Sequence, residues 1–201
     1  MQLEINLKLN RCPFCAIAKP LMKMEVDTVT NDCNKSRQQF WKIYKCSNCG
    51  GLVSAVSYSG RTEHVAAVYP PEESTSEDLP AKARSFLQQA MESIHAPAGA
   101  VMLAASSIDA MLKEKGYKDG TLNSRIIQAA KDHVITEDMA KWAHQVRLEA
   151  NDQRHSDEGA ELPTEADAKR SIEFAKAMGQ FMFVLPAMVT RGLKESTPAA
   201  K

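Results

Sequence analysis

The chain has 201 residues, of which 44% are hydrophobic and 25% charged, and its formal net charge is zero. These values exclude a wholly disordered chain, and no run approaches the roughly 18–20 apolar residues that span a bilayer. The length allows one ordinary domain with a small one, or two small domains.

The first residues, Met-Gln-Leu-Glu-Ile-Asn, lack the basic region and apolar stretch of a secretory signal. We therefore expect a cytoplasmic protein with no membrane partner. Paired cysteines in such a protein more often bind metal than form disulfides, because cytoplasmic thiols stay reduced.

Short β-type runs at 3–9, 40–45 and 52–58 characterise residues 1–69. This segment carries nine Lys/Arg against five Asp/Glu, a balance of +4. A positive balance can attract phosphate, and it can equally be an ordinary solvated surface.

Two Cys-x-x-Cys pairs, Cys12 with Cys15 and Cys46 with Cys49, are separated by thirty residues. Two residues between cysteines allow a tight turn to aim both sulfurs at one metal ion, and two such turns complete a tetrahedron. The glycines after Cys49 permit the positive φ that the turn needs. The pattern predicts a structural zinc site of zinc-ribbon type, with Cys33 as a spare thiol.

An alternating segment of aromatic and basic residues, 40–45, lies between the two cysteine pairs. The sequence leaves two interpretations open. The aromatic side chains form the core of a small ribbon, or they form a stacking surface for single-stranded nucleic acid.

Residues 70–80 have prolines at both ends and four acids, with no apolar face. They predict an extended linker between a ribbon domain at 1–69 and a helical domain at 81–190, with a tail at 191–201. Helical periodicity predicts segments at 80–96, 97–115, 122–133, 137–151 or 137–155, and 165–185. Thr136 and Thr164 are the expected caps of the last two segments, and Pro186 is expected to kink or end the final one.

Four polar residues, His144, Arg147, Asn151 and His155, fall on one face of the fourth predicted helix. Imidazole, guanidinium and amide groups in line can bind a phosphate, with a histidine acting on a ribose hydroxyl. The same spacing also suits a hydrogen-bonded surface stripe without chemistry.

Several short motifs resemble the domain of unknown function 4145, a HEPN-like helical domain that often follows a cysteine-pair ribbon. The motifs are the Ala-Pro-Ala-Gly-Ala-Val start of the second helix, Ile-Asp within it, the 147–155 segment, and Phe-Val-Leu-Pro-Ala near the end. With the ribbon, the resemblance covers most of the chain. It implies an α+β chain, in which a small N-terminal β zinc ribbon precedes a HEPN-like antiparallel helical bundle.

HEPN relatives are commonly dimeric, and many are metal-independent ribonucleases that use an arginine and a histidine four to six residues apart. This branch looks associated with restriction and other prokaryotic defence genes. Here Ala150 occupies the position where that arginine is expected, and Arg147 lies eight residues before His155. The branch usually has Arg and Glu on its second helix, whereas this chain has Ala105 and Asp109. Asp109 can still orient Arg147 or His155.

We therefore expect binding of nucleic acid, RNA or DNA, or of a defence-system protein partner, without catalysis. One alternative is a ribonuclease toxin that uses Arg147 and His155, with Asn151 positioning the substrate. Another is a structural dimerisation module. The last predicted helix is apolar on more than one side at 181–185, which favours a homodimer formed through the helical domain.

Overall fold

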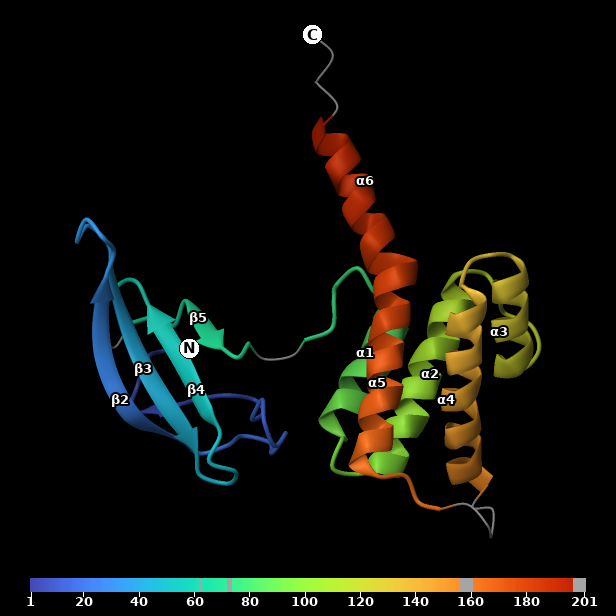
Figure 1. The fold of residues 1–201 in the computed structure, drawn as a ribbon, viewed down its shortest axis with the longest axis horizontal. Coiled ribbons are helices and arrows are strands. Elements are labelled where there is room, and N and C mark those ends of the chain that lie inside the picture. Colours follow the sequence, from blue (N-terminus) through green and yellow to red (C-terminus); the bar gives the residue numbers. More distant parts are fainter. Residues whose placement is uncertain (62, 72–73, 156–160, 197–201) are drawn as a thin grey trace. The chain divides into compact units, whose positions relative to one another are not determined.

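A computed structural model describes residues 1–61, 63–71, 74–155 and 161–196, with the backbone alone described at 152–155. The chain divides into two compact units, Met1–Glu73 and Ser74–Lys201. We call them the ribbon unit and the helical unit, and each is described by itself (Figure 1).

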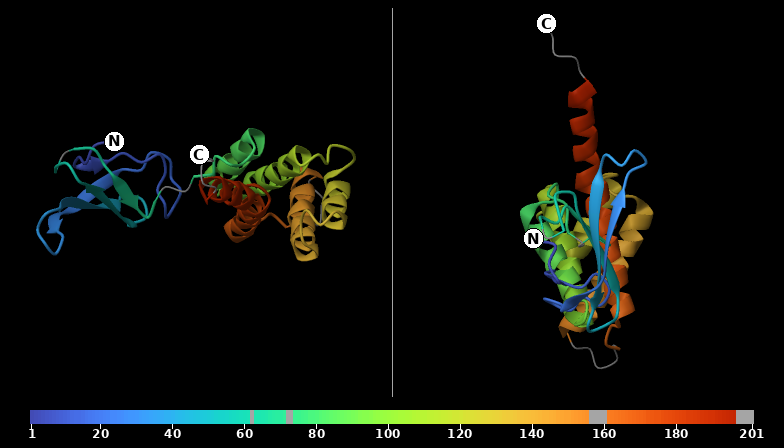
Figure 2. Two further views of the ribbon diagram at one scale, coloured as in Figure 1. Left: turned by 90° about the horizontal axis from the view of Figure 1, so that it is seen from above. Right: turned by 90° about the vertical axis from the view of Figure 1, so that its left-hand side faces the viewer.

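The ribbon unit contains a five-stranded antiparallel sheet whose strands follow one another in chain order. The strands are β1 (Asn6–Leu7), β2 (Met22–Asn31), β3 (Gln38–Cys46), β4 (Leu52–Ser57) and β5 (Ala67–Tyr69). Both views in Figure 2 show this sheet as one twisted layer. β2 and β3 form a long hairpin, and its connecting loop lies between Asn31 and Gln38, the last pair of the ladder.

Strand β2 is not among the β-type runs expected from the sequence. Its only fully buried residue is Met22, and Met24 packs partly against the core. The first half of the strand, Met-Lys-Met-Glu-Val-Asp, alternates apolar and charged residues, which is a strand pattern that the sequence interpretation did not use. The alternation is short because the register shifts between Met24 and Val26, and the remaining positions are mostly exposed.

One face of the sheet covers the core of the ribbon unit. Tyr44 is fully buried there, and its hydroxyl donates to the Glu4 carbonyl at 2.7 Å. Phe40 packs partly against the same core. Trp41 points to the other face because side chains alternate along a strand. The core interpretation therefore holds for Tyr44 and Phe40 and is wrong for Trp41.

The helical unit consists of helices whose apolar stripes face a common core. They are α1 (Ala81–Glu92), α2 (Pro97–Glu114), α3 (Leu122–Lys131), α4 (Glu137–His155), α5 (Glu165–Gly179) and α6 (Leu185–Ser196), with a π-helical turn, η1 (Gln180–Val184), before α6. α2 packs against α1, α4 and α5.

The predicted N-terminal caps of α4 and α5 are confirmed. The Thr136 hydroxyl accepts from the Met139 amide at 3.1 Å. Thr164 and Asp167 form a reciprocal capping box at the start of α5. These local side-chain bonds satisfy amide groups that the first helical turn leaves without partners.

Pro186 was expected to kink or end the final helix, and the helix does not end there. The π-helical turn η1 precedes the proline, and α6 continues to Ser196, through part of the predicted tail. A π-turn changes the local hydrogen-bond register, so the helix accommodates a residue that lacks an amide proton. Figure 1 shows α6 extending beyond the other helices of its unit.

The second half of the predicted linker belongs to the helical unit. Leu79 is buried in the helical core. Asp78 accepts two hydrogen bonds from the Arg191 guanidinium, at 2.7 and 3.0 Å. Leu79 and Asp78 therefore anchor the chain before α1, and Asp78 ties it to the middle of α6.

One helical stretch, Glu165–Ser196, is long and apolar enough by composition to cross a membrane. This is weak support for a membrane span, because the core helix of a soluble protein passes the same test. Its first part, α5, is such a core helix, with Phe174 and Met178 fully buried.

Candidate functional site

The four paired cysteines converge in the ribbon unit. The sulfur atoms of Cys12, Cys15, Cys46 and Cys49 all lie within 4.8 Å of one another. The Cys12 and Cys49 sulfurs are 3.8 Å apart, too far for a disulfide. Metal–sulfur bonds of about 2.3 Å in a tetrahedron place sulfurs about 3.8 Å apart. The cluster therefore fits one metal ion held by four thiolates.

Two matched turns build this cluster. In each turn, the backbone amide of the first cysteine donates a hydrogen bond to a carbonyl two residues beyond the second cysteine. The Cys12 amide donates to the Ile17 carbonyl at 3.0 Å, and the Cys46 amide donates to the Gly51 carbonyl at 2.9 Å. The residue after each second cysteine has a positive φ, 55° at Ala16 and 75° at Gly50. The glycine expectation is confirmed at Gly50, where only a residue without Cβ adopts this conformation freely.

The local environment shifts the pKa values of the two thiols of the first turn in opposite directions. Burial raises the pKa of the Cys12 thiol to about 12. Burial also acts to raise the pKa of Cys15, but hydrogen bonds from the Ile17 amide and the Asn48 side chain lower it to about 7. Donors aimed at sulfur are the second shell that stabilises a metal-bound thiolate. With four thiolates and no position for water, the arrangement is structural in character.

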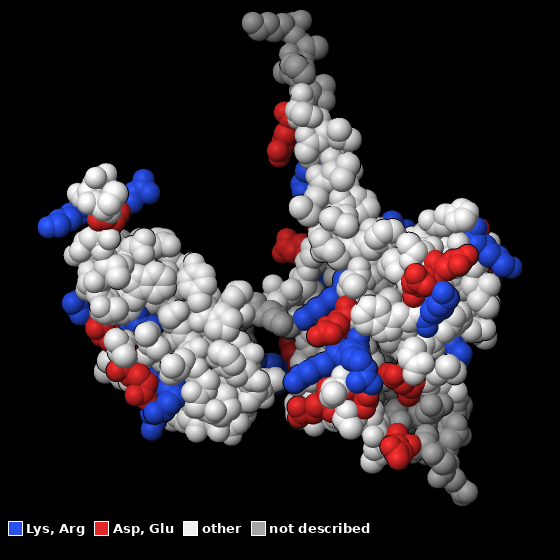
Figure 3. Space-filling view, viewed as in Figure 1, with Lys and Arg blue, Asp and Glu red and all other residues white. Residues whose placement is uncertain are grey.

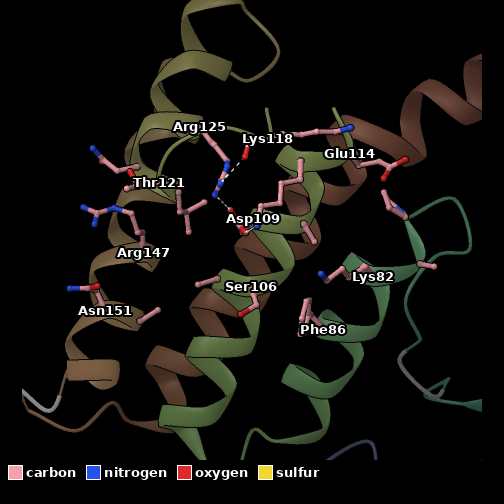
Figure 4. A pocket seen from close by; sticks show the side chains of 18 residues that line it. Lys82, Phe86, Ser106, Asp109, Glu114, Lys118, Thr121, Arg125, Arg147 and Asn151 are labelled. Atoms are coloured by element: carbon pink, nitrogen blue, oxygen red, sulfur yellow. Dashed lines mark hydrogen bonds and ion pairs between the residues drawn. The ribbon is translucent and has the colours of Figure 1, made fainter. Parts of the chain in front are cut away.

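A second feature, in the helical unit, is a groove of about 1240 Å³ that runs from the start of α1 across α2 and α3 to α4 (Figure 4). Arg147 and Asn151 line it, as do Ser106, Asp109 and Arg125. In Figure 4 the Arg147 and Asn151 side chains extend from α4 in the same direction, whereas Arg125 turns toward Asp109.

Asp109 does not orient Arg147, contrary to the expectation from sequence. Its carboxylate accepts from Arg125 at 2.6 Å and pairs with Lys113 at 2.5 Å. The Arg125 side chain is only 11% exposed, and it also donates to the carbonyls of Lys118 and Gly120. This cluster ties α2 to α3 and to the turn between them, so its role is to shape the groove.

Arg147 and Arg125 differ in their ion pairs. Both have a buried Nε without a hydrogen-bond partner among the described residues. Arg125 is paired with Asp109, whereas the Arg147 guanidinium makes no ion pair with any described residue. Buried donors are normally satisfied by protein or water. A guanidinium that lines a groove and keeps free donors is equipped to bind an anion.

The predicted polar stripe is only partly assembled. Arg147 and Asn151 line the groove, but His144 does not. Burial, and then the positive charge of Arg147, lower the pKa of His144. The backbone of His155 closes α4, and its side chain lies outside the described residues.

The groove has a positive balance of charge. Its lining holds five bases and two acids, a net of +3: Lys82, Lys113, Lys118, Arg125 and Arg147 against Asp109 and Glu114. Elsewhere, on the face drawn in Figure 3, basic and acidic side chains of the helical unit are intermingled. The lysines and Arg125 were missed by the sequence analysis, because no spacing along the chain relates residues contributed by α1, α2 and α3.

The family model of a domain of unknown function (DUF4145) matches residues 87–195, which is more than half of the chain. The chain belongs to the DUF4145 family. The match includes α2, α3 and α4, so most of the groove belongs to the DUF4145 domain. Ala105 and Ala150, two of the three positions that depart from the pattern expected by resemblance, are buried in the groove wall, at 4% and 3% exposed. No curated protein and no solved structure gives a match.

Proposed function

We propose that this DUF4145 protein is a zinc-containing, HEPN-like nucleic-acid-binding protein of prokaryotic defence, and that it acts in the cytoplasm without catalysis. The observation that carries the proposal is the groove in which Arg147, with free donors, lies beside Asn151 under a net positive charge. A phosphate backbone supplies the anion, and backbone contacts provide most of the affinity in non-specific binding.

Zinc is the metal proposed for the four cysteines. Tetrahedral sites with four thiolates suit zinc or iron–sulfur centres, and the paired turns of a ribbon are typical of zinc. Metal analysis of the purified protein is expected to give one zinc per chain. The Cys46→Ser, Cys49→Ser double variant should lose it.

Two observations support binding over cleavage. Ala150 occupies the position where HEPN ribonucleases place an arginine, and Ala105 occupies a position on the second helix where this branch usually has a charged residue. The carboxylate of Asp109 is committed to Arg125 and Lys113, so it does not activate Arg147. The competing candidate, a ribonuclease that uses Arg147 and His155, is favoured by the position of Arg147 and Asn151 in one groove.

The test combines binding and cleavage on the same RNA. We expect the wild-type protein to shift the anisotropy of a labelled single-stranded RNA and to leave it intact during prolonged incubation. Arg147→Ala should weaken binding about tenfold, or about 1.4 kcal/mol, which is the lower end of the range for a hydrogen bond to a charged group. Arg170→Ala, which removes the same charge from the exposed surface of α5, should have little effect.

The His155→Ala variant separates the two candidates. RNA hydrolysis by the wild type that disappears in His155→Ala would replace the binding proposal with the ribonuclease. Equal binding by wild type and Arg147→Ala would show that the groove is not the nucleic-acid site.

We also propose that two copies associate through α6. No residue of α6 is buried, and apolar side chains recur along it with exposures of 45–64%: Leu185, Met188, Val189 and Leu193. Lys194 and Glu195 lie beside this stripe, and neighbouring charges of both signs suit a two-fold contact with a second α6. Light scattering at micromolar concentration should give a dimer mass, and Val189→Glu with Leu193→Glu a monomer. A monomeric wild type would remove this part of the proposal and leave α6 for a defence-system protein partner.

A further inference from the structure

The ribbon unit presents a second face of its sheet, on the side away from its core. Strand pairing aligns its side chains: Thr28 lies opposite Trp41, Trp41 opposite Val56, and Ser54 opposite Tyr69. Because side chains alternate along each strand, the face comprises the outward positions of β2 to β5, among them Thr28, Thr30, Trp41, Ser54, Val56 and Tyr69. We call this the outer face.

Two aromatic rings from strands that are not neighbours meet on the outer face. The rings of Trp41 on β3 and Tyr69 on β5 have centroids 6.1 Å apart and planes inclined by 34°. Tyr69 is 49% exposed, while Val56, directly across from Trp41, is fully buried. This burial indicates that the indole lies over the sheet. One side of the ring pair therefore rests on the strands, and the other side is open.

The polar edge of the indole is already satisfied. Trp41 Nε1 donates to Thr30 Oγ1 at 3.0 Å and to Gln39 Oε1 at 3.2 Å. These bonds fix the ring without using its π face. A ring held in one orientation before a ligand arrives loses little entropy on binding.

The chemistry around the rings suits an unpaired nucleic-acid strand. Uncharged hydrogen-bonding groups, Thr28, Thr30 and Ser54, lie beside them, and Lys23 and Lys45 occupy one end of the face. Within β2 to β5, the acid near this face is Glu25, at the strand irregularity, and it is paired with Lys45 at 2.6 Å. Because Glu25 neutralises Lys45, the charged groups at this end of the face, Lys23, Lys45 and Glu25, leave a net charge of +1 beside the rings.

Exposed aromatic side chains on an open sheet bind single strands by stacking on successive bases, each worth about 1–3 kcal/mol. The two rings are neighbours, with centroids 6.1 Å apart, so two neighbouring bases of an unstacked strand can each engage one ring. A duplex cannot, because its bases are already stacked inside the helix.

We propose that the outer face of the ribbon unit is a base-stacking site for single-stranded nucleic acid, with Trp41 and Tyr69 as its platform. This site is separate from the helical groove. It would bind the bases by stacking, whereas the groove is proposed to bind the phosphates. The stacking site does not depend on Arg147.

Tryptophan fluorescence of the full chain tests the proposal. Trp41 and Trp142 are the two tryptophans, and Trp142 packs against Phe174 in the helical unit. The Trp142→Phe variant keeps an aromatic ring there and leaves Trp41 as the reporter. Addition of oligo(dT) or oligo(rU) of about 16 nucleotides, the upper site size of a small β-domain, should quench Trp41. A duplex of equal length should not.

Matched substitutions separate stacking from simple apolar contact. Affinities of these variants are measured by the anisotropy of a labelled oligonucleotide, because the Trp41 variants lack the fluorescent reporter. Tyr69→Phe and Trp41→Phe keep a ring and should bind the oligonucleotide within about threefold of wild type. Tyr69→Leu and Trp41→Leu keep an apolar surface without a π face, and each should weaken binding about tenfold or more. Metal content at wild-type level establishes that each variant retains its ribbon. Arg147→Ala should leave the quenching at saturation unchanged, so failure of the groove and failure of the face are distinguishable.

Three results would overturn the proposal. The first is absence of Trp41 quenching at saturating oligonucleotide in the Trp142→Phe protein, a measurement that needs no change to the face. The second is equal quenching by duplex and single strand. The third is equal affinity of the leucine and phenylalanine variants, which would identify the face as an apolar surface for a protein partner.

Discussion

The two units of this chain keep their folds by different means. Among the described residues, the helical core contains 25 buried apolar side chains and the ribbon core contains 10. Two of those ten, Cys12 and Cys46, are metal ligands. A core of this size rarely stabilises a small domain, and a structural metal commonly makes up the difference. The comparison teaches that metal binding is part of the ribbon's folding energy, whereas the helical unit folds on apolar packing.

The largest expected effect follows from removing the metal site. Structural zinc contributes about 10 kcal/mol or more in finger peptides, so Cys46→Ser with Cys49→Ser should unfold the ribbon unit and leave the helical unit intact. Two-dimensional NMR spectra should lose the dispersed amide signals of residues 1–69 and keep those of the helices. Cys33→Ser, which changes an exposed cysteine outside the cluster, should leave the spectrum unchanged. Retained ribbon signals in the double variant would contradict the comparison.

A substitution in the helical core should produce the opposite pattern. Phe174 is fully buried, and its ring centroid lies 4.8 Å from that of Trp142. Phe174→Ala should lower the free energy of unfolding of the helical unit by about 3–5 kcal/mol through lost burial and a cavity, without loss of metal. Chemical denaturation followed by circular dichroism measures this. Leu162→Ala, at a site 80% exposed, should change stability little.

Two residues of the groove should differ in their effect on stability: Asp109 belongs to a structural ion pair, and Arg147 is proposed to bind the ligand. Asp109→Ala leaves Arg125 buried without its carboxylate, and we expect a loss of about 2 kcal/mol in helical stability. This is below the 3–5 kcal/mol of a fully buried pair, because Asp109 keeps some solvent contact. Glu173→Ala, an exposed acid on α5, provides the matched control. A stability loss for Arg147→Ala as large as that for Asp109→Ala would show that Arg147 is structural.

The smallest effect concerns pH. Hydrogen bonds from Arg191 lower the pKa of Asp78 below its usual value. The unfolded chain therefore binds the proton more tightly, so the stabilisation is present at neutral pH and is lost as pH falls below about 4. Wild type and Asp78→Asn should differ in melting temperature at pH 7 and converge in acid. A constant difference across that range would exclude the Asp78–Arg191 contact as its source.

Features encoded by local spacing were predictable from the sequence. The cysteine pairs identified the metal ligands because each turn is set by four consecutive residues. Helical periodicity located α1 to α5, and Thr164 marked a helix start, since capping depends on residues three positions apart. Arg147 and Asn151 were placed together for the same reason, as neighbours on one helix face.

Features that depend on contacts between distant segments were not predictable. The full length of β2 depends on its pairing with β3, because the apolar alternation of its first half ends at Val26. The partner of Asp109 is Arg125 on another helix, and no pattern along the chain connects them. The same holds for Trp41: alternation placed it on one of two faces, but the sequence did not show which face covers the core or that Tyr69 joins it from β5.

The central claim is that Arg147 contacts a nucleic-acid phosphate in the helical groove. Its most direct test is the affinity for one single-stranded RNA, measured across a series of salt concentrations. Loss of one phosphate contact should weaken binding in Arg147→Ala and reduce the slope of log affinity against log salt by about 1. Arg147→Lys should also weaken binding but keep the wild-type slope, because an ammonium retains the charge without the planar fork. Affinity and slope of Arg147→Ala equal to those of the wild type would contradict the account.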